Sequence, residues 1–257
     1  MNLWEAALSG ILQGISEFLP ISSSGHLVLL HHFFGYKEPQ ILFDIILHIG
    51  TLFAILVYFR NDIVSIFTKR RYFLYLIMIG LIPTGVIGFL FEAFFRQAFS
   101  SIKLVGFMLI LTSAVLFSAD FVTSYMKKRG AHRLKFGVAQ ALIIGIAQGI
   151  SALPGLSRSG VTISTALMCR VTKEHAIRYS FLMAIPAVLG ALFLELRNTD
   201  ALSVIFTPQM IVGFFSAFIV GLVAIYYVIM AVTREKLWFF GVYCLLVGGV
   251  VLVKAYF

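Results

Sequence analysis

The stretch Gln13-Gly-Ile-Ser-Glu-Phe-Leu-Pro-Ile-Ser-Ser-Ser-Gly-His26 returns later in the chain, in altered form, as Gln148-Gly-Ile-Ser-Ala-Leu-Pro-Gly-Leu-Ser-Arg-Ser-Gly160. At a fixed offset of 135 residues, positions 6–25 match positions 141–160 at ten of twenty places. Both copies are polar and rich in Gly, Ser and Pro, while their surroundings are apolar. The first copy carries Glu17 and His26, and the second carries Arg158. The repeat therefore indicates two similar elements with different charged side chains.

The composition is that of an integral membrane protein. Of 257 residues, 60% are hydrophobic and 12% are charged, and the mean hydropathy is +0.99. The charged share is about half that of a soluble domain, which needs polar residues to cover its outside. The net charge of +9 comes from bases clustered in short connecting segments, so we expect no nucleic-acid partner. Cys169 and Cys244 lie in or near apolar segments and are expected to be inert.

Two apolar regions are interrupted in the middle by the repeated motif. Residues 4–34 are broken at 20–25, and residues 136–169 are broken at 154–160. Each half is too short to cross a bilayer, which needs about 20 residues. Irregular backbone at membrane depth survives only where protein or water satisfies it, so we predict two re-entrant helical hairpins with polar tips. The remaining apolar stretches predict six full spans, at residues 41–59, 72–91, 103–122, 178–196, 209–231 and 238–256.

The predicted fold class is an all-α integral membrane protein, with six full spans plus two re-entrant helical hairpins in a single membrane domain of residues 1–257. Residues 1–122 form the first repeat, a hairpin plus three spans, and residues 136–257 form the second in the same order. A hairpin returns to its own side, whereas three spans change sides. The second repeat therefore starts on the opposite face, which gives inverted-topology repeats of the kind found in transporters.

Lysine and arginine predict the orientation of the chain in the membrane. Five of them fall on the side of the N-terminus and fourteen on the other side, with Arg158 set aside because it lies in a hairpin tip. The positive-inside rule makes the richer side cytoplasmic. Both termini are then expected outside, with the first hairpin entering from outside and the second from the cytoplasm. The N-terminus lacks a basic region before an apolar one, so we expect no cleaved signal peptide.

The serine-rich tips predict an anion site. Serine is a preferred N-cap, and a helix N-terminus offers free N–H groups that suit phosphate. The simpler alternative is that these serines only cap helices and the glycines only allow close packing; for Thr162, helix packing and a phosphate contact remain equally open. The candidate phosphate-binding residues are Ser22, Ser24, Gly25, Ser157, Ser159, Gly160 and Thr162.

Four charged or nucleophilic side chains in the tips are the candidate catalytic groups: Ser23, His26, Glu17 and Arg158. Ionisable residues inside a membrane are costly and by default functional. Ser23 and His26 share a face at a helix start, and a serine beside a base can be an activated nucleophile. Glu17 could orient His26, act as the base, or hold a divalent cation. Arg158 is suited to bidentate phosphate binding.

The two motifs, together with Pro-Gly-Leu-Ser-Arg-Ser-Gly-Val-Thr from Pro154 to Thr162, closely resemble undecaprenyl pyrophosphate phosphatase, the bacitracin-resistance membrane family. The resemblance extends over the whole chain. It implies a bacterial inner-membrane enzyme that removes one phosphate from C55 undecaprenyl diphosphate, recycling the lipid carrier for peptidoglycan synthesis. It also implies that Glu17, Ser23, His26 and Arg158 are the essential groups, and that activity depends on a divalent cation, Mg²⁺ or Ca²⁺.

One position departs from many relatives, which have Glu where this chain has Gln13. Gln cannot supply a second carboxylate, so a metal site at Glu17 with Gln13 nearby would be built on one carboxylate only. The rival interpretation is a lipid flippase or anion transporter on the same inverted repeat, because fold alone does not fix function. A homodimer is compatible with the sequence.

Polar residues inside the predicted spans are interpreted as structural. Asp44 and His48 lie four residues apart on one helix and could pair. Asp120 and Glu195 lie near helix ends, where solvation is the simpler explanation.

Overall fold

The computed structural model describes residues 1–129, 135–196, 207–234 and 236–256, with only the backbone described for residues 194–196. Within these ranges the chain forms twelve helices and no strand, which confirms the predicted all-α class. The helices are α1 (Leu3–Phe18), α2 (Ser23–Phe33), α3 (Ile41–Tyr58), α4 (Arg60–Thr68), α5 (Arg71–Leu90), α6 (Glu92–Ala98), α7 (Ile102–Lys128), α8 (Val138–Ile150), α9 (Arg158–Met168), α10 (Lys173–Leu196), α11 (Pro208–Thr233) and α12 (Leu237–Tyr256).

Six of these helices are long and apolar enough to cross a membrane, as the sequence predicts: α3, α5, α7, α10, α11 and α12. The chain is therefore a multi-pass membrane protein. The structure adds the short helices α4 and α6 where the sequence predicts only connections. Ile66 of α4 and Ala98 of α6 are buried, and an ion pair between Glu92 and Arg96 links successive turns of α6, so each short helix packs an apolar side against the bundle.

The two interrupted regions form paired short helices. α1 and α2 have 16 and 11 residues, and α8 and α9 have 13 and 11. At about 1.5 Å per residue, none of them reaches across a hydrocarbon core of about 30 Å. Within each pair the two helices pack against each other. The pairs are therefore hairpins that turn back at their polar tips, as predicted.

The helix starts repeat along the chain. Leu3 of α1 and Val138 of α8 lie 135 residues apart, and the same offset relates the starts of α2 and α9 and of α7 and α12. The packing is reciprocal as well, because α1 lies along α11 while α8 lies along α5. Gly10 and Gly145, one offset apart, each bring their helix against partner backbone, at Gly213 and Gly80. Small residues allow such close crossings between membrane helices, and these features support the two-repeat organisation, which stays a proposal.

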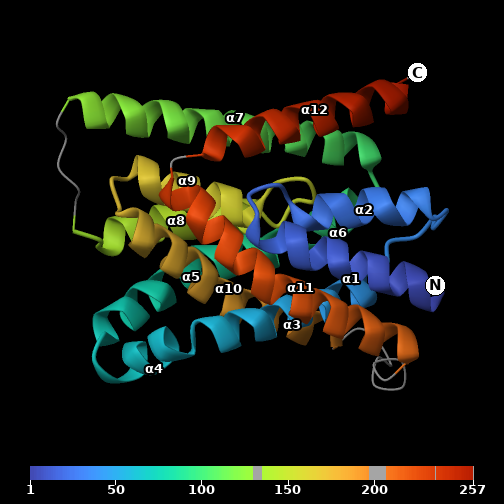
Figure 1. Ribbon diagram of the computed structural model, residues 1–257, viewed down its shortest axis with the longest axis horizontal. Helices are drawn as coiled ribbons and strands as arrows, with labels where there is room; N and C mark the ends of the chain where they lie inside the picture. The colour runs from blue at the N-terminus through green and yellow to red at the C-terminus, as the bar shows by residue number, and fades with distance from the viewer. Residues whose placement is uncertain (130–134, 197–206, 235, 257) are drawn as a thin grey trace.

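Figure 1 shows where the two chain ends and the helices at the edges of the bundle lie. Both termini lie at the same end of the molecule, while α4 lies at the opposite end. α7 and α12 run side by side along one edge and pack against each other. The main buried apolar cluster lies between α3, α5, α8, α9, α10 and α11, where Phe181 packs edge-on against Phe18 beside the first tip.

Candidate active site

The two hairpin tips meet in the middle of the bundle. We name residues 19–26 the first tip and residues 151–160 the second tip. Ser159 Oγ of the second tip donates to the Leu19 carbonyl of the first at 3.1 Å. A Cβ on Gly25 would lie 2.7 Å from Gly155 Cα, so the backbones touch where both residues are glycine. Two segments far apart in the sequence therefore form one site.

Each tip contains a serine that caps the helix that follows the turn. Ser22 Oγ accepts from the Gly25 amide at 3.3 Å, and Ser157 Oγ accepts from the Gly160 amide at 3.0 Å. The capping that the sequence predicts is therefore present at α2 and α9. The amides of the first turn that remain outside the helical ladder still lack intrahelical partners. These amides are the groups that a phosphate could use.

Glu17 is the centre of the contacts between the tips. Its Oε1 accepts from the Arg158 guanidinium of the second tip. Its Oε2 accepts from Ser23 Oγ at 2.6 Å and from Gln13 Nε2 at 3.0 Å. Glu17 is 6% exposed, so its charge is balanced by Arg158 rather than by water. One carboxylate thus joins the candidate nucleophile to the candidate phosphate-binding cation.

His26 lies beside this cluster but does not contact Ser23 through any described hydrogen bond. Its Nδ1 bonds to the Ser22 carbonyl at 2.7 Å, and its Nε2 bonds to the Tyr243 hydroxyl of α12 at 2.8 Å. Of the two bases that the sequence leaves open for Ser23, the geometry favours Glu17.

The hydroxyls of the other candidate phosphate-binding residues already have hydrogen-bond partners within the protein. Ser24 Oγ lies 3.4 Å from Ser22 Oγ, and Ser159 Oγ lies 3.4 Å from Ser157 Oγ. Thr162 is fully buried, and its hydroxyl bonds to the Arg158 carbonyl at 2.8 Å and to Ser180 Oγ at 2.6 Å. A phosphate contact by Thr162 would have to replace these bonds, so that role stays a prediction.

Two residues of the site were missed by sequence reasoning. The sequence predicts that His48 is a structural partner of Asp44. In the structure its Nδ1 bonds to the Asp44 carbonyl at 2.7 Å, while its Nε2 lies 3.4 Å from Glu17 Oε2. The spacing of Asp44 and His48 on one helix is the feature of the sequence that could have drawn attention to His48. Tyr243 gave no signal, because it lies in an apolar span 217 residues from His26.

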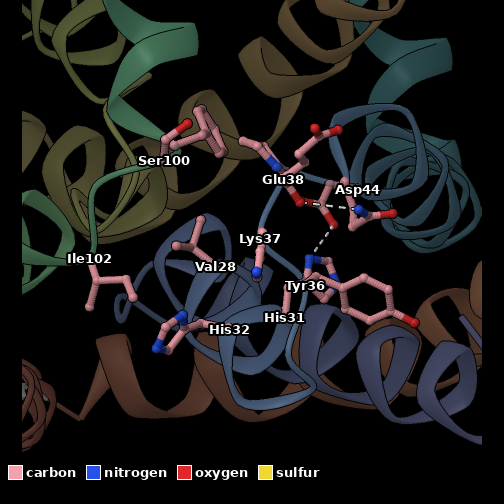
Figure 2. Close-up of a pocket in the computed structure, with 12 residues that line it drawn as sticks. Val28, His31, His32, Tyr36, Lys37, Glu38, Asp44, Ser100 and Ile102 are labelled. Atoms are coloured by element: carbon pink, nitrogen blue, oxygen red, sulfur yellow. Dashed lines mark hydrogen bonds and ion pairs between the residues drawn. The ribbon is translucent and has the colours of Figure 1, made fainter.

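A second polar cluster lies at the ends of α2 and α3, away from the tips. Figure 2 shows His31 pointing at the Asp44 carboxylate, with Nδ1 3.7 Å from Oδ1. His32 and Lys37 line the same pocket. Asp44 and His48 therefore face different neighbours, His31 and Glu17 respectively. Asp120 lies within α7 and is partly exposed, and the side chain of Glu195 lies outside the described residues.

The site offers few protein ligands for a divalent cation. Among the residues whose side chains are described, no group of three His, Cys, Asp or Glu side chains could hold a metal ion. Gln13 Oε1, however, is buried beside Glu17 without a described hydrogen-bond partner. Mg²⁺ commonly takes one or two carboxylates, waters and substrate phosphate oxygens. One carboxylate and one free amide oxygen fit that sparse mode of binding, and they do not fit an all-protein cage.

The fold and site together define a class: a multi-pass membrane protein whose two re-entrant hairpins bring an acid, a serine and an arginine to one buried polar site. A family model described as "Bacitracin resistance protein BacA" matches residues 6–250. The chain belongs to this bacitracin-resistance family, as the motifs indicate.

Similar proteins extend this result over the whole chain. The chain is 40% identical over 260 residues to an "Undecaprenyl-diphosphatase" of Halothermothrix orenii, covering 99% of both proteins. It is 41% identical to one of Syntrophotalea carbinolica, covering 97% of both. A third, of Carboxydothermus hydrogenoformans, is 40% identical over 98% of this chain and 97% of its own.

Proposed function

We propose that the protein hydrolyses undecaprenyl diphosphate to undecaprenyl phosphate and inorganic phosphate. The observation that carries the proposal is the Glu17 carboxylate, which is bonded at once to Ser23 Oγ and to the Arg158 guanidinium. A nucleophile, its base and a cation for the phosphate thereby meet at one point. The names of the relatives support the substrate.

The diphosphate would bind between the tips. α2 and α9 both begin there, so two positive helix ends face the site. Arg158 donates to Glu17 Oε1 and, at 3.4 Å, to the Ser180 carbonyl. A phosphate at the start of α9 would compete with Glu17 for the guanidinium, which can bind two oxygens at once. Substrate binding would then free Glu17 Oε1 from its strongest partner and make the carboxylate a better base.

Ser23 would attack the terminal phosphorus. A bond forms from Oγ to phosphorus, the Oγ proton passes to Glu17 Oε2, and the bond from phosphorus to the bridging oxygen breaks. Undecaprenyl phosphate leaves with the proton that Glu17 gives up. A water molecule then attacks the phosphoserine and passes a proton to Glu17, the bond from phosphorus to Ser23 Oγ breaks, and that proton returns to Oγ as phosphate leaves. The attacking and leaving oxygens are in line, so catalysis depends mainly on positioning and charge stabilisation. Direct attack by water, with Ser23 only binding, is the alternative mechanism.

A divalent cation would be held by Glu17 and Gln13 Oε1 together with phosphate oxygens. When bound, it would offset the negative charge of the diphosphate. Mg²⁺ and Ca²⁺ are the proposed ions. The sequence departure at Gln13 limits the protein ligands to one carboxylate, so we propose that much of the coordination comes from the substrate and water.

The protein is proposed to act in the bacterial inner membrane, with both termini and the first hairpin facing outside. The distribution of lysine and arginine supports this orientation, and the common end of the two termini agrees with it. Hydrolysis there would recycle the lipid carrier of peptidoglycan synthesis and oppose bacitracin. A homodimer stays a prediction. A transporter would not require a serine held by a carboxylate at the tip, which favours hydrolysis over the flippase or anion-transporter interpretation.

Phosphate release by the purified protein tests the function. We expect release from undecaprenyl diphosphate with Mg²⁺ or Ca²⁺, and loss of release with a chelator. Ser23→Ala should lower turnover by about 10³-fold or more if Ser23 is the nucleophile. Ser16→Ala is the control, because the Ser16 hydroxyl bonds to the Leu12 carbonyl of its own helix. No release with any cation would refute the function, and near-normal turnover of Ser23→Ala would leave water as the nucleophile.

A further inference from the structure

The last span reaches the first tip through one side chain. The Tyr243 hydroxyl lies 2.8 Å from His26 Nε2, and the two rings stack with centroids 5.6 Å apart and planes 10° apart. The neighbouring Cys244 Sγ donates to the Pro20 carbonyl at 3.8 Å. Two adjacent residues of α12 therefore contact the first tip at both of its ends, although α12 belongs to the other half of the chain.

The hydrogen bonds of His26 determine its tautomer. The Ser22 carbonyl can only accept, so the bond at Nδ1 requires a proton on that nitrogen. In the neutral ring Nε2 then carries the lone pair and accepts from the Tyr243 hydroxyl. Both ring nitrogens are thus engaged, and the ring is fixed by one bond to its own helix and one to α12. A histidine held in this way has one defined basic atom, and Tyr243 controls access to it.

We propose that Tyr243 is a positioning residue of the active site: its hydroxyl binds Nε2 of His26 and its ring stacks on the imidazole, so that together they hold the imidazole in one orientation at the first tip. This inference rests on the proposed hydrolysis. Tyr243 acts through His26 and does not touch the reacting atoms. The contact between Tyr243 and His26 also explains why Ser23 bonds to Glu17. While the tyrosine is in place, both nitrogens of His26 are occupied and neither is free for Ser23.

Tyr243→Phe is the test, because it keeps the stacked ring and removes only the hydroxyl. The loss of one neutral hydrogen bond predicts a kcat about tenfold lower with KM changed less than twofold. Since the hydroxyl binds His26 Nε2, its removal should also shift the nitrogen NMR resonance of that atom. Tyr226→Phe on α11 is the matched control, because it removes the hydroxyl of an exposed tyrosine, and it should change neither quantity.

Two further measurements separate positioning from general support of the fold. In a His26→Asn background, Tyr243→Phe should have no additional effect on kcat, since coupled residues are not additive. Nitrogen NMR of labelled histidine should show a proton on Nδ1 of His26 in both proteins, because the Ser22 carbonyl remains, and a shifted Nε2 resonance in Tyr243→Phe only.

Independent, multiplying effects on kcat, or an unchanged His26 Nε2 resonance in Tyr243→Phe, would overturn the role of Tyr243. If the unaltered protein releases no phosphate, the proposed function fails instead. The NMR result then still decides whether Tyr243 binds His26 Nε2.

Discussion

The two hairpin tips have the same framework and different contents. Ser22 and Ser157 cap their helices in the same way, and the first residue of the following helix is Ser23 in one and Arg158 in the other. The proposed nucleophile and the proposed phosphate-binding cation thus occupy equivalent positions. Glu17, which contacts both, has no counterpart in the second tip, where the sequence has Ala152. In the proposed mechanism, the duplicated helix start supplies the nucleophile in one copy and neutralises charge in the other.

The tips also differ in what holds them. The first tip is contacted by side chains of α12, whereas the second is bound by Thr112 of α7. Thr112 Oγ1 donates to the Gly155 carbonyl at 2.9 Å and accepts from the Ser157 amide at 3.0 Å. The support of the first tip thus includes the side chain of a catalytic candidate, His26, whereas Thr112 contacts the second tip only through its backbone. We therefore expect substitutions in the α12 side chains that contact the first tip to lower activity. Substitution of Thr112, which binds the second tip, should lower stability instead.

The largest expected effect comes from removing the cation of the second tip. Arg158→Ala should lower phosphate release by about 10³-fold or more, because it removes a charge-stabilising donor and leaves the Glu17 carboxylate buried without its partner. Arg158→Lys should recover little, since the planar fork that binds two oxygens is lost. Steady-state rates in detergent would measure both variants. Near-normal activity of the lysine variant would show that a point charge is sufficient.

Glu17→Gln should have the next largest effect. The amide has the same shape but cannot take the Ser23 proton, so turnover should fall by about 10²- to 10³-fold. Glu92→Gln is the control, because Glu92 forms an ion pair with Arg96 on the surface helix α6. A small loss in Glu17→Gln would shift the role of base to His26 and would remove the main chemical difference between the tips.

The fold is well predicted from the sequence because it is determined mainly by the lengths of the apolar runs. Six long apolar runs and two interrupted ones leave few arrangements, since a half-length helix in a membrane must turn back. The repeat then brings Glu17 and Arg158 together across 141 residues of chain. The helices α4 and α6 were missed, because short amphipathic helices at the bundle surface have no length requirement to reveal them.

The details of the site depend on packing between spans, which the sequence does not report. Helical spacing placed Ser23 and His26 on one face, yet Ser23 bonds to Glu17 and His26 bonds to Tyr243. His48 reaches Glu17 from α3 for the same reason. In an apolar span every face is compatible with lipid or protein, so no pattern in the sequence marks which polar side chain faces the tip.

Thr112→Val should destabilise the protein by about 2–3 kcal/mol, because it leaves a buried amide and a buried carbonyl of the second tip without partners. Activity per folded molecule should fall much less than in Glu17→Gln. Thermal unfolding in detergent checks this, with Thr123→Val on the same helix as control, since the Thr123 hydroxyl bonds only to carbonyls of α7. An equal fall in turnover and no change in stability would contradict a structural role for this support.

The smallest expected effect concerns the backbone of the two capping serines. Ser22 has φ 72° and Ser157 has φ −69°; only the first lies in a region that L-residues rarely adopt. In the second tip the positive φ falls on Gly155, at 94°, where it carries no steric cost. Glycine at an N-cap costs only a few tenths of a kcal/mol, whereas a strained residue stores about 1 kcal/mol or more.

Ser22→Gly should therefore leave stability unchanged or raise it by about 0.5 kcal/mol, while Ser157→Gly should lower stability slightly. The two variants remove the same hydroxyl from equivalent caps, so the difference between their unfolding temperatures isolates the strain at Ser22. Strain is commonly retained where it fixes the geometry of a site, and Ser22 supplies the carbonyl that holds His26 Nδ1. Relief of strain should consequently lower kcat severalfold in Ser22→Gly alone. Equal effects of the two variants would mean that the first tip is no more strained than the second, and that its geometry comes from its side-chain contacts.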